Sequence, residues 1–209
     1  MIRSLEWVIV LLGIGLPLAI LISVSIYAFE SARVRNALTT LFLIPFAIPP
    51  IASAILWRWM LDVFRGLDAL IGINYPWLSA TTTYWSPSFW SVALISLWIY
   101  TGFAVLYFLA SFYNIEPSQI ESAKIDGASY LRIVTSILLP QSGPAIVVVS
   151  TFLIAYAFGI FDVVLVLSGT YLANTNVFSY GIYIYNTFLS GFIPRASAAA
   201  VILAILLFL

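Results

Sequence analysis

Long apolar runs alternate with short polar segments along the whole chain. A helix that crosses a bilayer needs roughly 20 predominantly apolar residues, and most of these runs reach that length. The pattern predicts an all-α integral membrane protein with about five transmembrane helices, in a single transmembrane domain over residues 1–209. The expected spans cover residues 7–29, 37–60, 89–112, 143–167 and 195–209.

Prolines interrupt the second of these runs. Pro45, Pro49 and Pro50 all lie within it. Proline has no backbone donor, and its ring clashes with the preceding turn of a helix. We therefore expect this span to be kinked or broken, either as a packing feature or as a hinge.

The composition agrees with a lipid environment and excludes several classes of function. Hydrophobic residues make up 63% of the chain and charged residues 8%, whereas a soluble domain carries about a quarter charged residues. The net charge is zero, so nothing indicates a nucleic-acid partner. The chain has no Cys and no His, which removes thiol nucleophiles, disulfides, the commonest metal ligand and the usual general base. We expect neither enzymatic activity nor a cofactor or metal.

Residues 116–140 form a charged segment between two apolar runs. Five of the eight basic and eight acidic residues of the chain lie between Glu116 and Arg132. Charges are costly in hydrocarbon, so this segment belongs outside the bilayer or in a protein-lined space. Pro117 favours a helix start there.

The local pattern also predicts the shape of the charged segment. Ser118 and Glu121 have the spacing of a capping box, in which Ser caps the helix and Glu reaches back three residues later. A short helix should end at about Lys124 and break near Gly127. A second helical piece should then lead to Pro140.

The spacing of residues within the charged segment resembles a known motif. Glu121-Ser122-Ala123 is followed after three residues by Gly127, and nine residues later by Ile137-x-Leu139-Pro140. This resembles the EAA loop in the membrane subunits of binding-protein-dependent ABC importers, with Ser122 in place of Ala as the one departure. Residues 125–129, Ile-Asp-Gly-Ala-Ser, resemble the form found in carbohydrate importers. The stretch from Phe161-Asp162 to Ser168-Gly169 resembles maltose-type F-subunits.

The resemblance covers nearly the whole chain and implies a function. It implies a permease subunit of an ATP-driven carbohydrate importer, in the cell membrane of a bacterium or archaeon. The expected partners are a second permease subunit, two cytoplasmic ATPase subunits that hydrolyse ATP, and an extracellular sugar-binding protein. Permeases of this group usually have six or more spans, so we expect this chain to lack one or more terminal helices of the family.

The resemblance also assigns residues of the charged segment to ATPase coupling. It places the segment on the cytoplasmic side as a helix that docks on the ATPase. Small residues would allow close approach, Glu121 would pair with a basic group, and Gly127 would allow the turn. The implied coupling residues are Glu121, Ser122, Ala123, Asp126, Gly127 and Pro140.

A solute pathway is expected near the middle of the membrane, between two permease subunits. Four residues of the third span share one helical face at i, i+4, i+7 and i+11: Ser96, Tyr100, Phe103 and Tyr107. Asp162 is ionisable within an apolar run, which marks a functional candidate, although it can also hold a helix end. For the tyrosines the alternative is interhelical packing. The predicted pathway residues are Ser96, Tyr100, Phe103, Tyr156, Gly159 and Asp162.

Three other functions remain to be weighed. The first is an ABC importer permease for a non-sugar solute such as a polyamine, phosphate or an amino acid. The second is an intramembrane enzyme, which would need a nucleophile–base pair or metal ligands that this composition does not provide. The third is a scaffold, which would not couple ATP hydrolysis to uptake.

Overall fold

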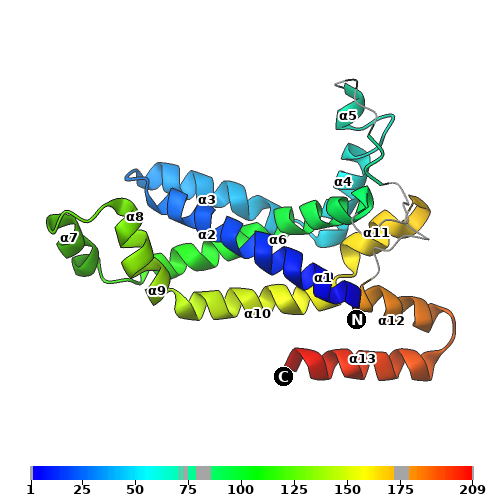
Figure 1. Cartoon of the computed structure of the whole chain (residues 1–209). Coiled ribbons are helices and arrows are strands. Elements are labelled where there is room, and N and C mark those ends of the chain that lie inside the picture. The colour runs from blue at the N-terminus through cyan, green and yellow to red at the C-terminus, as the bar shows by residue number, and fades with distance from the viewer. Residues whose placement is uncertain (1, 71, 73–74, 79–85, 172–178, 209) are drawn as a thin grey trace.

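The computed structural model describes residues 2–70, 72, 75–78, 86–171 and 179–208 (Figure 1). Every regular element in these residues is helical, as the apolar pattern predicts. The elements are α1 (Ile2–Val10), the π-helical η1 (Leu11–Gly15), α2 (Leu16–Tyr27), α3 (Ala32–Ala47), α4 (Pro50–Met60), α5 (Leu67–Leu70), α6 (Pro87–Tyr113), α7 (Pro117–Ile125), α8 (Tyr130–Ile133), the π-helical η2 (Val134–Leu138), α9 (Leu139–Gln141), α10 (Gly143–Gly159), α11 (Asp162–Tyr171), α12 (Tyr180–Leu189) and α13 (Ile193–Phe208).

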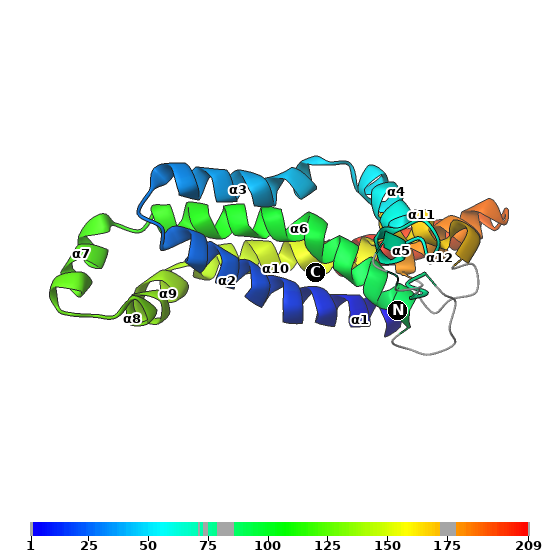
Figure 2. The same ribbon diagram turned by 90° about the horizontal axis from the view of Figure 1, so that it is seen from above.

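Helix α6 is the centre of the bundle. It packs against α2, α3 and α10, which run roughly along its length (Figures 1 and 2). Its buried side chains include Ile95, Val105 and Phe108, each of which is 0% exposed. At one end of the bundle, Trp7 of α1 stacks on Phe89 with ring centroids 4.3 Å apart. Burial of large apolar side chains between neighbouring helices therefore holds this part of the fold together.

In the part of the chain that the structure describes, three helices are long and apolar enough to cross a membrane. They are Ser4–Tyr27, Pro87–Tyr113 and Gly143–Leu167, and they correspond to the predicted runs 7–29, 89–112 and 143–167. A fourth span is present if α3 and α4 are counted together. The last predicted run, 195–209, corresponds to α13, which is apolar but too short to be counted as a span, so the described residues contain three or four spans where the sequence predicted about five.

The proline-rich run is broken, as predicted. α3 and α4 meet at an angle of 95°. Ile48 and Pro49 adopt extended backbone with ψ of 130° and 135°, and Pro50 then starts α4. The residue before a proline is sterically biased away from the helical region, so two successive prolines end α3 and redirect the chain.

A second break divides the run predicted as one span over 143–167. α10 ends at Gly159, Ile160 has an extended ψ of 114°, and α11 begins at Asp162. The second halves of the two broken runs, α4 and α11, pack against each other. Arg58 of α4 donates from Nη1 to the carbonyl oxygen of Val166 at 3.2 Å. α4 and α11 thus pack together at the end of the bundle away from α7 (Figure 1), although only the α3–α4 break bends its run sharply.

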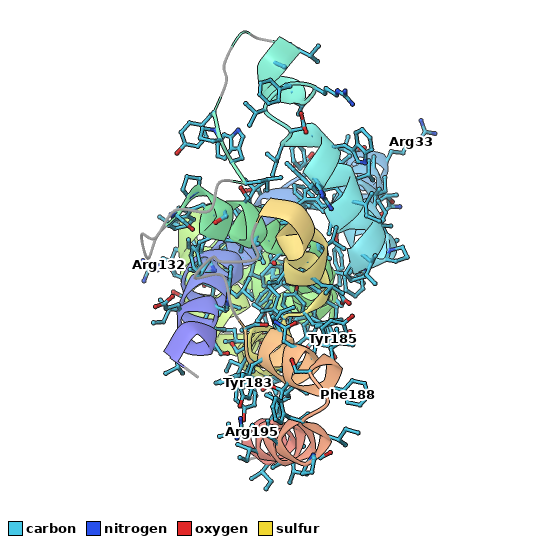
Figure 3. All side chains as sticks on the ribbon, turned by 90° about the vertical axis from the view of Figure 1, so that its right-hand side faces the viewer. Arg33, Arg132, Tyr183, Tyr185, Phe188 and Arg195 are labelled. Atoms are coloured by element: carbon cyan, nitrogen blue, oxygen red, sulfur yellow. The ribbon has the colours of Figure 1, made fainter. Side chains whose placement is uncertain are left out.

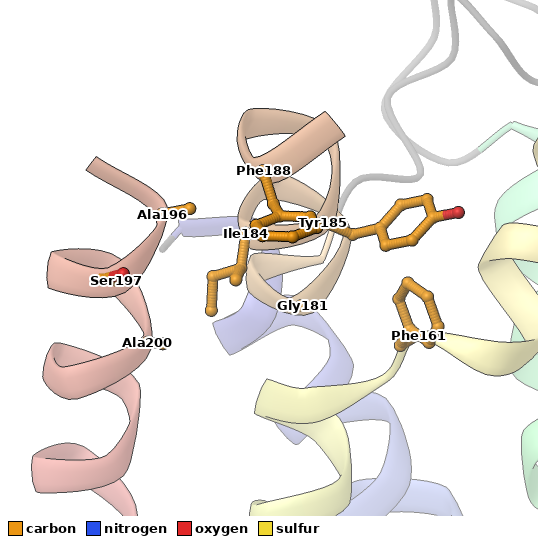
Figure 4. A pocket seen from close by; sticks show the side chains of 8 residues that line it. All are labelled: Phe161, Gly181, Ile184, Tyr185, Phe188, Ala196, Ser197 and Ala200. Carbon is orange, nitrogen blue, oxygen red and sulfur yellow. The ribbon is translucent and has the colours of Figure 1, made fainter. Parts of the chain in front are cut away.

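Helices α12 and α13 form an antiparallel hairpin (Figure 1). Seen along the bundle, the hairpin lies on the side of the molecule opposite α4 and α5 (Figure 3). A largely apolar groove of about 380 Å³ opens between the hairpin and the α10–α11 break (Figure 4). It is lined by Phe161, Gly181, Ile184, Tyr185, Phe188, Ala196, Ser197 and Ala200.

Candidate functional site

Helix α7 stands clear of the bundle at one end (Figure 1). None of its residues is buried, and Glu121 and Ser122 are exposed. The helix starts at Pro117 with Glu116 as its N-cap, which makes no side-chain capping bond. The capping box predicted for Ser118 and Glu121 is therefore wrong. Proline at the first helical position sets φ for the helix, and Ser118 consequently lies inside it.

The end of α7 has the form of a Schellman motif. The Ala128 N–H donates to the Ala123 carbonyl at 2.9 Å, and the Gly127 N–H donates to the Lys124 carbonyl at 3.1 Å. Gly127 has a φ of +75°, which is the left-handed conformation that this motif requires. The predicted break near Gly127 is confirmed, and its cause is local backbone hydrogen bonding.

The chain returns to the bundle through α8, η2 and α9. Ser129 caps α8 by accepting from the Arg132 N–H at 3.4 Å. Pro140 lies inside the short α9, and the next span begins at Gly143. The preceding turn is π-helical, with the Leu139 N–H donating five residues back to Val134. Proline has no N–H to continue the i−4 hydrogen bonds of an α-helix. The irregular π-helical turn therefore lies directly before the residue that cannot donate such a bond.

Three hydrogen bonds hold the charged segment and its junction to the bundle. Directly after the segment, Gln141 Nε2 donates to Gln119 Oε1 at 2.6 Å and ties α9 to α7. At the junction with α10, the Ser111 hydroxyl donates to the Ser142 hydroxyl at 3.1 Å. The third donor is Tyr130, whose hydroxyl is 2.6 Å from the Val24 carbonyl oxygen of α2.

Tyr130 remains a neutral donor over the physiological pH range. Burial, together with the nearby Tyr27, raises the pKa of Tyr130 to about 12. A phenol normally titrates near pH 10, so its proton is retained well above neutrality.

Two apolar side chains of the charged segment point into open surroundings. Ile125 is 86% exposed and Leu131 is 71% exposed. The end of α7, the Gly127 turn, α8 and η2 line an open pocket of about 490 Å³, whose lining includes both Asp126 and Arg132. The sequence prediction named Asp126 but not Ile125 or Leu131. The sequence did contain a signal for Ile125 and Leu131, because both are apolar residues in a segment that otherwise belongs in water.

The structure brings together four of the six predicted pathway residues. The Ser96 and Tyr156 hydroxyl oxygens are 3.4 Å apart. The Tyr100 and Tyr156 ring centroids are 3.9 Å apart. Phe103 is one turn from Tyr100 on the same face of α6, and its ring contacts α10 through Phe152 at 4.4 Å. The face predicted on α6 therefore meets α10, with Ser96 and Tyr100 buried.

Gly159 and Asp162 lie on either side of the α10–α11 break. Gly159 is the last residue of α10 and Asp162 the first of α11. A carboxylate in the first turn of a helix is stabilised by the helix dipole, so this position has a structural reason of its own.

Two aromatic residues that the sequence prediction missed complete this region. Phe46, in the last turn of α3, lies 5.4 Å from Phe103 and 6.2 Å from Tyr100 between ring centroids. Phe152 of α10 contacts both of the same residues. We call these five residues, Phe46, Tyr100, Phe103, Phe152 and Tyr156, the aromatic cluster. No sequence pattern predicts that Phe46 belongs to this region, because the bend after α3 determines which residues of its last turn reach α6.

Sequence comparison identifies relatives among membrane transport subunits. Residues 15–209 match the family described as binding-protein-dependent transport system inner membrane component. The glucose import system permease protein GlcT of Saccharolobus solfataricus is 32% identical over 99% of this chain and 72% of its own length. The sn-glycerol-3-phosphate permease protein UgpA of Yersinia pseudotuberculosis is 30% identical over 70% of this chain. The matching region spans about half of UgpA, 49% of its length.

Structural comparison gives the same result. A subunit of a bacterial ABC transporter involved in import of the acidic polysaccharide alginate superposes with a TM-score of 0.83 and 26% identity. The match covers 99% of this chain and 73% of that one. The fold, the family match over residues 15–209 and the relatives all agree. The chain belongs to the family of binding-protein-dependent transport system inner membrane components, the multi-pass permease subunits of ABC importers.

Proposed function

We propose that this chain is the permease subunit of an ATP-driven carbohydrate importer. It forms the solute pathway with a second permease subunit and receives force from two cytoplasmic ATPase subunits through the charged segment. An extracellular binding protein delivers the sugar. The observation that carries the proposal is an exposed helix, α7, that ends in a glycine turn closed by backbone hydrogen bonds and is joined to α9, just before α10, by a side-chain hydrogen bond.

The exposure pattern of α7 supports a docking role and distinguishes its two faces. Ile120 and Ala123 are half-buried and pack toward the bundle, three residues apart. Glu121, Ser122 and Ile125 are exposed on the remaining surface. Ala123 belongs to the half-buried face of α7, while the exposed Glu121 and Ile125 offer a charge and an apolar contact to a partner.

The aromatic cluster supports a carbohydrate as the solute. Aromatic faces cover the C–H surfaces of sugars, and the hydroxyls of Ser96, Tyr100 and Tyr156 can exchange hydrogen bonds with sugar hydroxyls. The predicted pathway residues carry one acid, Asp162, and no base. A phosphate or carboxylate solute would favour Arg or Lys there. The glucose and alginate transporters among the matches agree with a sugar, whereas the glycerol-3-phosphate relative keeps the non-sugar alternative open.

Reconstitution tests the proposal directly. The chain is assembled in proteoliposomes with its partner permease, ATPase subunits and binding protein, and ATP-dependent uptake is measured for neutral sugars, phosphate, polyamines and amino acids. We expect uptake of a neutral sugar. Uptake of only phosphate, a polyamine or an amino acid would replace the proposal with the non-sugar alternative, and no ATP-dependent uptake of any solute would favour a scaffold.

A single hydroxyl tests the solute pathway separately. Tyr156→Phe removes the hydroxyl that faces Ser96 but keeps the ring contacts. We expect the KM for uptake to rise about fivefold, because the solute loses one hydrogen bond. The basal ATPase rate should be unchanged. Tyr183→Phe, at an exposed ring on α12, is the matched control. An unchanged KM in Tyr156→Phe would remove this hydroxyl from the pathway.

A further inference from the structure

The charged segment is covalently continuous with only two of the spans. Its first residues follow α6 and its last residues lead into α10. Together, α6, the charged segment and α10 form one continuous unit. The Gln119–Gln141 and Ser111–Ser142 hydrogen bonds stay within it, because they join α7 to α9 and α6 to the start of α10. A displacement of α7 would reach α6 and α10 through the chain itself.

One further hydrogen bond leads out of this unit. The Tyr130 hydroxyl donates to the Val24 carbonyl oxygen at 2.6 Å, across 106 positions of sequence. Val24 is in the last turn of α2, and its carbonyl also accepts the Ala28 N–H at 3.1 Å. Among the hydrogen bonds of the described residues, this is the one that joins the charged segment to α2.

The acceptor lies in a cluster that joins α2, α3 and α6. The ring of Tyr27 contacts Phe112 at 5.7 Å and Tyr113 at 5.5 Å, both at the end of α6. Arg35 of α3 lies over the Tyr113 ring at 5.7 Å and donates to the Phe29 carbonyl at 3.1 Å. A force on Val24 would therefore act on the end of α2, and the turn between α2 and α3 would move together with α2.

We propose that Tyr130 is a positioning residue for energy coupling, whose hydroxyl links the charged segment to α2. Displacement of the segment by the ATPase subunits then moves α2 and the α2–α3 turn together with α6 and α10. The inference rests on the proposed function, since it assumes that ATPase subunits act on this segment. Tyr130 itself need not touch the ATPase.

Tyr130→Phe in the assembled transporter tests this link. The variant keeps the ring and removes the donor. We expect association with the ATPase subunits and basal ATP hydrolysis to stay within about twofold of wild type, while binding-protein-stimulated hydrolysis and uptake fall about fivefold. Tyr113→Phe is the matched control, because it removes a hydroxyl from the same cluster and leaves the ring contacts with Tyr27 and Arg35.

A distance measurement separates transmission from a merely structural role. Spin labels at Arg33→Cys and Ser118→Cys, both exposed, report the α2–α3 turn and α7 in a chain that has no cysteine of its own. With an intact link the two labels move together when ATP binds, so their separation stays nearly constant. In Tyr130→Phe we expect the separation to change on ATP binding.

Three outcomes would overturn the inference. They are wild-type stimulated activity in Tyr130→Phe, a label separation that responds to ATP identically in both proteins, or loss of ATPase association in the variant, which would make Tyr130 part of the docking surface. Absence of ATPase association in the wild-type chain would instead overturn the proposed function, and the inference with it.

Discussion

Two glycines of this chain are required for different physical reasons. At Gly102 the reason is space, because a Cβ there would lie 2.0 Å from the Phe42 carbonyl oxygen of α3. At Gly127 the reason is backbone conformation, because φ is +75° while nothing lies within 4 Å of a Cβ. Gly102 thus allows α3 and α6 to approach closely, as small residues do in membrane helix packing, and Gly127 allows the turn after α7.

Gly102→Ala should destabilise the bundle. The atom that the new Cβ meets is backbone, so relief requires α3 and α6 to separate. We expect a loss of about 1–3 kcal/mol, seen as a lower thermal midpoint in detergent. Gly13→Ala is the control, because a Cβ at Gly13 has no neighbour within 4 Å. Equal midpoints for the two variants would show that the helix crossing can relax without cost.

Gly127→Val should uncouple the transporter without preventing insertion into the membrane. A β-branched residue at this φ is strained by about 1–2 kcal/mol, so the Schellman turn should open and α7 should lose its orientation. We expect loss of uptake and of stimulated ATP hydrolysis. Gly127→Asn should retain most activity, since Asn tolerates the left-handed region. Unchanged uptake in Gly127→Val would argue against a coupling role for this turn.

At the scale of elements, the notable feature is the pairing of two broken runs. α4 and α11 each follow a break, at Pro49 and at Ile160, and pack against each other. The bond from Arg58 to the Val166 carbonyl joins them. Backbone that leaves the helical conformation within a membrane is tolerated where protein covers it, and this holds for the buried Ile160, whereas Pro49 is exposed.

Arg58→Met should loosen α4 from α11. It removes a charged donor, and hydrogen bonds to charged groups contribute about 1.5–3 kcal/mol. We expect faster limited proteolysis within α4 and a lower thermal midpoint. Arg65→Met, at an exposed position after α4, controls for the loss of a positive charge. If both variants were digested at the wild-type rate, the α4–α11 pairing would owe little to Arg58.

The whole molecule has two different ends. The charged segment occupies one end, and α4, α5, α11 and the α12–α13 turn occupy the other (Figure 1). Transport by the proposed mechanism requires the first end to be cytoplasmic. Basic residues do not establish this by number, because four lie toward each end. Arg33, Arg35, Lys124 and Arg132 lie toward the end with α7, and Arg3, Arg58, Arg65 and Arg195 lie toward the other.

Accessible single cysteines can determine the orientation. Because the chain has no cysteine, Ser118→Cys and Arg65→Cys each introduce a unique thiol at an exposed position. We expect a membrane-impermeant maleimide to label Arg65→Cys in intact cells and Ser118→Cys only after permeabilisation. The reverse pattern would place the charged segment outside the cell and contradict its role in ATPase coupling.

The sequence by itself determined the features that depend on neighbouring residues. Apolar length predicts the spans, two successive prolines break the second one, and Gly127 ends α7, because each of these follows from backbone geometry within a few residues. The capping box and the break at Ile160 were exceptions. Pro117 as first helical residue and Ser118 as N-cap give helix starts two residues apart, and the choice between them depends on small energy differences.

Only the tertiary structure decided which helix faces meet. Phe46 and Phe152 join Tyr100, α4 pairs with α11, and Tyr130 reaches Val24. The physical reason is the solvent. A soluble helix reveals its buried face by a polar opposite face, but a helix in lipid is apolar all round, so its sequence does not mark the side that packs. Close packing and a few long-range hydrogen bonds make that choice, and they exist only once the helices are assembled.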